Sequence, residues 1–355
     1  MTSKKAEHAA MVEERRPVYR ADLADGTERF FEPRRETCPW CESSRLRRHV
    51  RSNDVVQLKP GRFNLDRCTA CGHIFQNPML NDAGLEFYYR DFYDGLGEQD
   101  MGSVFEQNKK GYRSRAEAGK TVMDPKTWLD VGTGHGHFPQ VAKELFPQTR
   151  FDGLDLSDGV KLAEEAGRVE KGYCGDITEL SEQLADSYDA VSMFHYLEHT
   201  SDPRAHLKSA LRMLRPGGHL VIEVPDPECR WNRFLGRWWL PWMQPQHLNF
   251  VSIGNLRTAL AELGATVVVE QRDESRSCDD LPLSLWLVLN NATRTGENAP
   301  WIPTPSRARK LLRSAAIIAA IPLFVLSVVV DRAVMKLFKD RGFSNAYRVV
   351  AAKNS

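Results

Sequence analysis

The sequence predicts an α/β protein built around a doubly wound, mostly parallel sheet. Three observations carry this prediction. A short apolar strand, Thr127–Val131, leads into a turn containing Gly132, Gly134 and Gly136, after which a helix pattern begins. Strand and helix patterns then alternate, as they do where helical crossovers join parallel strands. An acidic residue, Asp155, closes the next strand, which is where a doubly wound sheet receives ribose hydroxyls.

The elements of this sheet can be placed from apolar and β-branched runs. Strands are expected at Thr127–Val131, Phe151–Asp155, Lys171–Cys174, Tyr188–Phe194, His219–Val224, Thr266–Gln271 and Asn345–Ala352. Helices are expected at Gly136–Leu145 and Pro203–Leu214. The turn Arg215-Pro216-Gly217-Gly218 should end the second helix, because proline and glycine both stop helices.

Composition restricts the partners and the compartment. The 355 residues carry a formal net charge of +1, which gives no electrostatic reason to expect a nucleic-acid partner. The first twenty residues are charged and lack the apolar segment of a signal peptide, so we expect a cytoplasmic protein. Residues 1–35 are poor in aliphatic side chains and are expected to form a mobile tail.

Two Cys-x-x-Cys pairs predict a zinc ribbon over residues 36–78. Cys38 and Cys41 form the first pair, Cys68 and Cys71 the second, and 26 residues separate them. Four thiolates complete a tetrahedral site, so the zinc would be structural, with no open position for catalysis. The basic residues from Arg45 to Arg51 lack an aromatic platform and are expected to form a solvated face.

Residues 79–125 are expected to form a helical linker that covers a ligand at the glycine turn. Their aromatic run, from Phe87 to Tyr93, can serve as ordinary core, and one or two tyrosines can also reach the ligand. The proline at 125 marks the boundary with the sheet domain, because the residue before a proline is pushed out of the helical region.

Five motifs resemble those of the class I S-adenosylmethionine-dependent methyltransferases, in the same order and at similar spacing. They are LDVGTGHGHF, GLDLS, CGDI, YDAVSMFHYLEHTSDP and LRPGGHLVIEVPD, within about Thr127 to Gly264. The resemblance implies the Rossmann-like methyltransferase fold, S-adenosylmethionine as cofactor, and methyl transfer. A nicotinamide dinucleotide is disfavoured because the third glycine of the turn comes one residue too early for its fingerprint. The ribbon also resembles an N-terminal module of some small-molecule and sugar methyltransferases.

The resemblance also implies which residues bind the cofactor. Asp130, Gly132 and Gly134 would line the methionine moiety, Asp155 would meet the ribose hydroxyls, and Asp176 with Ile177 would meet the adenine. The complete implied set is Asp130, Gly132, Thr133, Gly134, Asp155, Leu156, Asp176, Ile177 and Phe194. Judged without the resemblance, Asp176 serves equally well as a helix cap.

Three histidines are candidates for a general base, because an imidazole titrates near neutral pH. His195 and His199 belong to an H-x-x-E-H sequence at the carboxyl end of the fourth strand, and His247 lies in a P-x-H-L-x-F segment similar to one in many relatives. For His199, a backbone-bonded position at a helix start is an equal alternative. The zinc-peptidase interpretation of H-x-x-E-H needs a continuous helix, which this position does not favour. Some quinone methyltransferases hold a divalent metal near a similar Glu-His pair, but His195 replaces their first acidic ligand.

Two segments are expected on the substrate side. Four tryptophans between Trp231 and Trp242 can wall a pocket, meet a membrane interface or pack under the ribbon. Residues 274–342 separate two strands that a short hairpin normally joins, and Ser314–Val330 within them lacks charge. A broken helix or helical hairpin touching one leaflet through residues 281–340 fits this pattern, and a buried cap helix is the alternative.

The expected organisation has five parts: a tail (1–35), a ribbon (36–78), a linker (79–125), a methyltransferase domain (126–273 plus 343–355) and a hydrophobic helical insertion (274–342). We expect an S-adenosylmethionine-dependent methyltransferase acting on a small or lipid-linked hydrophobic acceptor, with oxygen as the favoured atom. It would work in the cytoplasm, at the inner face of the membrane if the insertion binds lipid. A sugar or nucleotide-sugar acceptor is one alternative. A zinc-ribbon nucleic-acid-binding protein with a methyltransferase-like fold is another, which the near-neutral charge disfavours.

Overall fold

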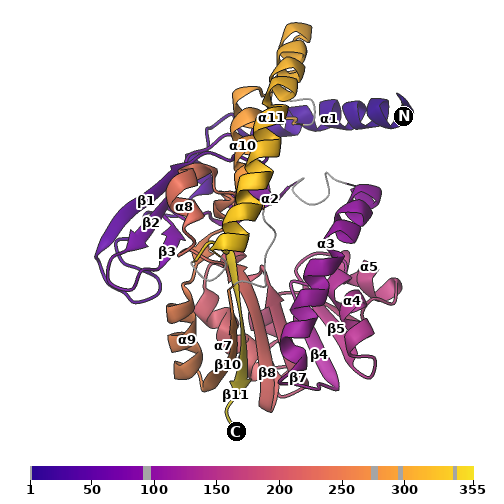
Figure 1. Ribbon diagram of the computed structural model, residues 1–355, viewed down its shortest axis with the longest axis vertical. Helices are drawn as coiled ribbons and strands as arrows, with labels where there is room; N and C mark the ends of the chain where they lie inside the picture. The colour runs from indigo at the N-terminus through magenta and orange to yellow at the C-terminus, as the bar shows by residue number, and fades with distance from the viewer. Residues whose placement is uncertain (1, 91–96, 273–278, 295–298, 339–341) are drawn as a thin grey trace.

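The computed structural model describes residues 2–90, 97–272, 279–294, 299–338 and 342–355 (Figure 1). Its central element is a seven-stranded sheet with the order β10-β11-β8-β7-β4-β5-β6. The strands are β4 (Thr127–Val131), β5 (Arg150–Asp155), β6 (Lys171–Cys174), β7 (Tyr188–Phe194), β8 (Leu214–Pro225), β10 (Ala265–Gln271) and β11 (Ala346–Lys353). Only β11 runs antiparallel to its neighbours, so the predicted doubly wound, mostly parallel sheet is confirmed.

Helices cover both faces of this sheet, as alternating strands and crossover helices require. One face packs against α3 (Gly97–Lys120) and α4 (His137–Leu145), with Trp128, Phe138 and Phe151 between the layers. The other face packs against α6 (Ile177–Leu180), α7 (Pro203–Met213) and α9 (Ile253–Glu262) through Ile177, Leu207, Leu256 and their neighbours. The helix α5 (Gly159–Glu165) lies beside α4 (Figure 1). The glycine turn therefore lies at the carboxyl edge of a sheet buried on both sides.

The segment Arg215–Gly218 differs from the expected helix-ending turn. The helix ends at Met213, and the strand β8 already begins at Leu214. Tyr188 pairs with Leu214 and Ala190 with His219, so the additional residues of β8 form a bulge against β7. Gly217, with φ of 75°, supplies the left-handed conformation that this bulge needs.

A second, four-stranded antiparallel sheet contains the cysteine pairs. Its order is β1-β2-β3-β9, with β1 (Leu46–Ser52), β2 (Phe63–Cys68), β3 (Ile74–Gln76) and β9 (Asn249–Phe250). The last strand comes from the far side of the main domain in sequence. The ribbon is therefore joined to the main domain by backbone hydrogen bonds as well as by the chain connection.

The tryptophan loop packs under this ribbon sheet. It consists of α8 (Trp231–Leu235) and two short 3₁₀ turns, Gly236–Trp238 and Leu240–Trp242. Trp239 and Trp242 are almost fully buried and share a core with Leu65, Ile74 and Phe250 of the ribbon. Of the three interpretations left open for these tryptophans, packing under the ribbon is the one that the structure shows for Trp239 and Trp242.

The N-terminal segment differs from the mobile tail expected over residues 1–35. Residues 2–22 form the helix α1, in which Tyr19 is 1% exposed. The guanidinium of Arg16 donates to the carbonyl oxygens of Pro300 (3.0 Å) and Ile302 (2.6 Å). The prediction of a mobile tail was based on the low aliphatic content of this segment. Aromatic and arginine side chains supply its contacts instead. The cover segment also contains α2 (Asp82–Tyr89), ahead of α3.

The predicted hydrophobic insertion contains two antiparallel helices, α10 (Asp280–Ala292) and α11 (Arg307–Leu337). α11 runs through Pro322 without a break, so the helical hairpin is the form observed and the broken helix is not. Most of its apolar side chains are exposed, contrary to the buried cap helix kept as an alternative. α11 is long and apolar enough to cross a membrane, judged by its length and composition. Figure 1 shows it rising from the main sheet beyond α10 and α1.

A buried ion pair ties the last strand into the sheet. Arg348 on β11 donates to Glu223 on β8 with Nη2 (2.5 Å) and Nε (2.9 Å), and both side chains are almost fully enclosed. Arg115 on α3 donates to the other oxygen of the same carboxylate at 2.9 Å. Removing one partner from such a cluster leaves charge in a medium that solvates it poorly.

We therefore expect Arg348→Met to lower the free energy of unfolding by about 3 kcal/mol, measured by urea denaturation. Arg257→Met is the matched control, because Arg257 pairs with Glu270 at an exposed position. That control should cost less than about 1 kcal/mol. Equal losses in the two variants would contradict the role assigned to the buried pair.

Candidate active site

The glycine turn after β4 takes a backbone course that favours glycine at three positions. Gly132, Gly134 and Gly136 have φ values of 74°, 52° and 73°. A Cβ atom at Gly132 would lie 2.8 Å from the Tyr196 ring, whereas one at Gly134 would meet no described atom within 4 Å. The turn is therefore tight on one side and open above Gly134, where a ligand can approach the backbone.

Asp155 lies at this opening. Its Oδ2 accepts a hydrogen bond from the Gly134 amide at 2.8 Å, and its Oδ1 accepts from the Ser157 amide (2.8 Å) and hydroxyl (2.7 Å). These bonds hold the carboxylate at the carboxyl ends of β4 and β5, where parallel sheets bind nucleotides. The neighbouring Leu156 is 68% exposed, so its apolar side chain is accessible to a ligand at this opening.

Asp130 and Thr133 lie deeper, beneath the turn. Asp130 is 4% exposed and its Oδ1 accepts from the Ser192 hydroxyl at 2.6 Å. Burial raises the pKa of Asp130 to about 7, partly offset by that hydrogen bond. Thr133 is buried, and its amide donates to the carbonyl oxygen of Leu154 at 3.3 Å. Both residues thus fix the turn against its neighbouring strands.

The residues expected at the adenine sit at the next strand end. Asp176 caps α6, accepting from the Thr178 amide at 2.7 Å and from the Thr178 hydroxyl. It therefore has the capping geometry weighed as the alternative, while Ile177 is fully buried. Phe194, at the end of β7, packs against Phe138 at 4.6 Å between ring centroids.

His195 is held between two carboxylates. Its Nδ1 lies 3.0 Å from Oε1 of Glu198, and its Nε2 lies 3.2 Å from Oε1 of Glu223. Burial opposes the charged ring, but these two carboxylates outweigh it and raise the pKa of His195 to about 9. His195 also has a left-handed backbone, with φ of 50°, an uncommon conformation for histidine. At neutral pH this residue is an imidazolium, which is a poor proton acceptor.

His199 and His247 are placed differently. Their rings meet edge to face with centroids 4.6 Å apart. His199 Nδ1 lies 2.7 Å from the Tyr89 hydroxyl and 3.1 Å from the Gln246 carbonyl oxygen. His247 Nδ1 donates to the Pro241 carbonyl oxygen at 2.7 Å, which leaves Nε2 with its lone pair. Burial lowers the pKa of both rings, to about 3 for His247, so both are neutral at physiological pH.

Glu198, His199 and His247 form the one group, apart from the cysteines, whose donor atoms within the described ranges could hold a metal ion. One donor atom from each lies within 4.8 Å of the others. The Oε2 atom of Glu198 is buried and has no hydrogen-bond partner among the described residues. Two neutral imidazoles and one carboxylate suit a divalent transition metal, and the same lone pairs can instead receive a substrate proton.

Three residues of the site were missed by sequence reasoning. Tyr89 contacts His199, and its only signal was membership of the aromatic run expected near the ligand. Arg115 places its guanidinium 5.1 Å from the centre of the Phe194 ring and also binds Glu223. Arg115 belongs to none of the five motifs, and Glu223 lies in LRPGGHLVIEVPD, which was used for its glycine turn and its strand only. The structure brings His195, His199 and His247, the three histidines predicted as candidates for a general base, into one cluster.

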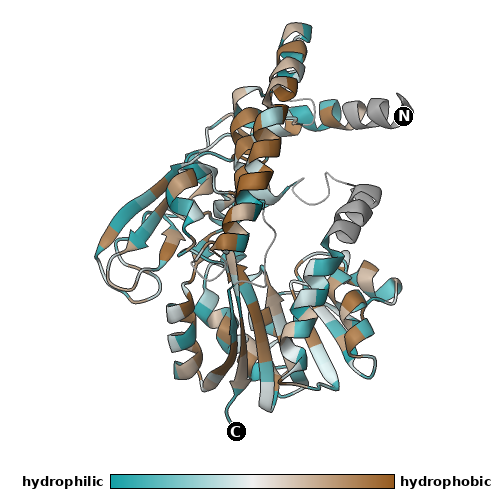
Figure 2. Ribbon diagram, in the orientation of Figure 1, coloured by the Kyte–Doolittle hydropathy of each residue, from teal (hydrophilic) through white to brown (hydrophobic). Residues whose placement is uncertain are grey.

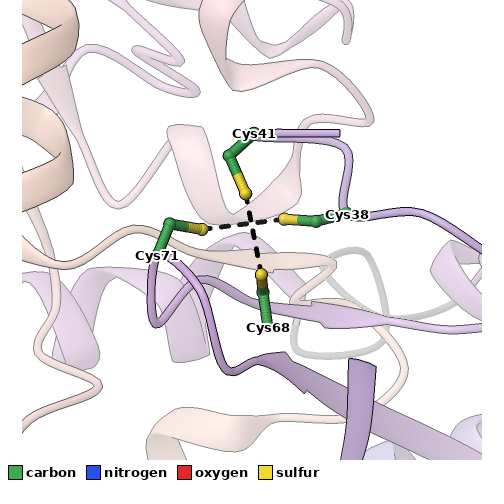
Figure 3. Close-up of side chains that lie close together, drawn as sticks. All are labelled: Cys38, Cys41, Cys68 and Cys71. Carbon is green, nitrogen blue, oxygen red and sulfur yellow. Dashed lines mark hydrogen bonds between the residues drawn. The ribbon is translucent and has the colours of Figure 1, made fainter. Parts of the chain in front are cut away.

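The four cysteines of the ribbon converge on one point (Figure 3). Cys38 Sγ lies 3.8 Å from Cys71 Sγ, and Cys41 Sγ lies 3.6 Å from Cys68 Sγ. Four sulfurs around a tetrahedral zinc, each at about 2.3 Å, would be about 3.8 Å apart. The cluster therefore has the geometry of a structural zinc site.

Residues 106–270 match a family model described as "Methyltransferase domain". Residues 106–270 are therefore similar to a methyltransferase domain. The predicted fold is confirmed, and the match supports the family and the S-adenosylmethionine cofactor that the sequence motifs imply.

Individual relatives match this domain over part of their length. A ubiquinone biosynthesis O-methyltransferase of Idiomarina loihiensis is 31% identical over 144 residues, covering 37% of this chain and 58% of that protein. A malonyl-[acyl-carrier protein] O-methyltransferase of Hahella chejuensis is 35% identical over 103 residues, covering 28% of this chain and 37% of that protein. A solved S-adenosylmethionine-dependent methyltransferase from Archaeoglobus fulgidus has 19% identity and a TM-score of 0.44, covering 74% of this chain and 100% of that one.

The cysteine geometry leads to a metal prediction. Full-length protein should contain about one zinc per chain, and Cys38→Ser or Cys68→Ser should lose most of it by elemental analysis. Cys174→Ser is the matched control, because Cys174 lies exposed near the Leu156 carbonyl oxygen on the main sheet. Full zinc retention in both ribbon variants would rule out a four-cysteine site.

Proposed function

We propose that the protein methylates a small or lipid-linked hydrophobic acceptor, preferably on oxygen, with S-adenosylmethionine as donor and a structural zinc in the ribbon. The observation that carries the proposal is the placement of Asp155 against Gly134 at the open side of the turn. An acidic acceptor for ribose hydroxyls next to an unobstructed glycine backbone fits this cofactor. The matched relatives named as O-methyltransferases of ubiquinone biosynthesis and of malonyl-[acyl-carrier protein] support oxygen and a small or carrier-linked acceptor.

The cofactor supplies an activated methyl group, and the chain supplies position and proton transfer. Asp155 and Leu156 would hold the ribose side, Asp176 and Ile177 the adenine side, and the remaining implied residues the methionine side. Binding the cofactor and the methyl acceptor side by side at the carboxyl edge of the sheet lowers the entropic part of the activation barrier. This positioning is the main catalytic contribution expected in methyl transfer.

His199 is the proposed general base when the acceptor carries a proton. It is only half-buried, whereas His247 is 4% exposed and Glu198 2%. If Tyr89 donates its hydroxyl proton to the Gln246 carbonyl, His199 Nδ1–H donates to the tyrosine oxygen and Nε2 keeps its lone pair. His247 is proposed to position His199 through the ring contact. His195, held as an imidazolium, is proposed to keep Glu198 ionised.

The cofactor assignment predicts that Asp155→Ala weakens S-adenosylmethionine binding at least about tenfold, because two hydrogen bonds to a charged acceptor disappear. Isothermal titration calorimetry measures the change. Asp158→Ala is the control: Asp158 is exposed and pairs with Lys161, so its loss should leave the affinity unchanged. An Asp155→Ala protein with wild-type affinity would refute the ribose assignment.

The base assignment predicts a drop in kcat of about a hundredfold or more for His199→Ala, with cofactor affinity retained. His247→Ala should lower kcat less, and its profile against pH should shift, because the position of His199 changes. His219→Ala is the control, because His219 lies within β8 and pairs with Ala190 near the start of β7, whereas His195 follows the end of β7. Full activity in all three variants of His195, His199 and His247 would show that the reaction needs no histidine base.

The acceptor class is tested by incubating cell lipid and polar extracts with methyl-labelled cofactor and the purified full chain. We expect the label in the lipid fraction or in small hydrophobic molecules. Label confined to nucleotide sugars would contradict the proposed acceptor, and no label in either fraction would contradict the proposed activity.

A further inference from the structure

One long face of α11 remains uncovered by the described residues. Its exposed apolar side chains run along most of the helix, and each of them is between 52% and 72% exposed. They are Leu311, Leu312, Ile318, Ile321, Leu323, Val325, Leu326 and Val329. Figure 2 shows α11 as the most continuously hydrophobic helix on this side of the molecule. Monomeric soluble proteins rarely leave so long an apolar stripe in water.

The opposite face of α11 packs against α10, so the uncovered face points away from α10. Near one end, the Leu281 amide of α10 donates to Asp331 Oδ2 at 3.0 Å. Near the other, Arg313 donates to the Thr293 hydroxyl at 3.1 Å, and its guanidinium lies 5.4 Å from the Trp286 ring centre. α10 therefore packs along α11 in an antiparallel arrangement and leaves the outer face free.

The charged residues that flank this face are all basic. Ser314–Val330 holds no charged residue over 17 positions, or about 25 Å of helix. Basic residues stand at both ends of it: Arg307, Arg309 and Lys310 before, Arg332 and Lys336 after, while Arg313 faces α10. The single acidic residue of α11, Asp331, is fully buried. The outer face is thus apolar in the middle and cationic at each end.

We propose that the outer face of α11 binds an anionic lipid bilayer, with the helix lying in the interfacial region. Apolar side chains would enter the acyl boundary while the terminal cations meet headgroup phosphates. A second copy of the chain is the rival occupant. Both ends of the outer face carry cations. If two α11 helices packed in parallel, the first end of one would lie beside the first end of the other. If they packed antiparallel, the first end of one would lie beside the last end of the other. Either arrangement brings like charges together, whereas anionic headgroups neutralise both ends.

The helix lies on the bilayer in this proposal because both of its ends are held by the same protein body. Before α11, the Trp301 indole donates to the Gln57 carbonyl oxygen at 2.9 Å, and Arg16 binds residues 300 and 302. After α11, the chain enters β11, where Ala346 pairs with Pro225 at the carboxyl end of β8. A helix crossing the bilayer would carry one of these attachments to the other side.

Vesicle flotation of the full chain tests this surface without any substrate. Wild-type protein should float with phosphatidylcholine–phosphatidylglycerol vesicles and at least about tenfold less with pure phosphatidylcholine, because the terminal cations lose their partners. Val325→Gln/Val329→Gln should reduce binding at least about tenfold, because both exposed side chains would enter the acyl boundary. Arg307→Gln/Arg309→Gln/Lys310→Gln should reduce the anionic preference and its sensitivity to salt.

Two control variants distinguish specific binding through α11 from non-specific adsorption to vesicles and from unfolding. Val122→Gln/Val268→Gln makes the same change at exposed positions on the main domain, and Arg47→Gln/Arg48→Gln/Arg51→Gln removes three exposed cations from the ribbon. Both should float like wild type, and all variants should bind S-adenosylmethionine equally. No flotation of wild type, or a dimer that Val325→Gln/Val329→Gln converts to monomer, would overturn the bilayer proposal. Cofactor binding would be unaffected by that failure, so the proposed enzymatic function is tested separately.

Discussion

The carboxylate of Glu223 is the contact on which the sheet and the site both depend. It lies near the carboxyl end of β8 and is bound by Arg348 from β11, Arg115 from α3 and His195 from the end of β7. One buried anion therefore fixes the last strand, the cover helix and the first histidine of the H-x-x-E-H sequence. Its pKa is held well below its usual range, because these cations outweigh the cost of burial.

The same interaction explains why three similar histidines have different properties. His195 sits next to Glu223 and Glu198 and carries charge, whereas His199 and His247 lie where burial keeps them neutral. The surroundings thus favour one charged ring and two neutral rings within a single cluster. Residue type alone would have made the three equivalent.

The main sheet was predictable because most of its strands are short runs rich in apolar or β-branched residues, and several of them end at a glycine, a proline or an aspartate. Thr127–Val131, Lys171–Cys174 and Tyr188–Phe194 have the expected bounds to the residue. Local pattern could not reveal contacts made between distant segments. α1 is stabilised by residues near 300, and Trp239 is buried by a ribbon strand far from it in sequence. The partners of Glu223 likewise come from three separate elements, and pairing of that kind leaves no periodic trace in a single chain.

The site was predictable to the extent that motifs mark strand ends. The glycine turn, Asp155, His195 and His199 were singled out this way, because the carboxyl edge of a parallel sheet collects the residues that follow each strand. His247 was singled out by its P-x-H-L-x-F segment instead. Tyr89 and Arg115 come from helices that fold over that edge, and their position depends on tertiary packing. The structure shows the capping geometry of Asp176, which was one of two expected alternatives, and the contact of Asp176 with the adenine stays a prediction.

The position of β11 has a consequence for how the molecule is assembled. This strand lies between β10 and β8, so the sheet has a gap in its interior until residues 346–353 have been synthesised. By then α11 has already been made, and its apolar face is available to bind whatever it meets first. Strand closure over such a long sequence separation is slow. The order of synthesis thus exposes the apolar face of α11 before the last strand completes the sheet.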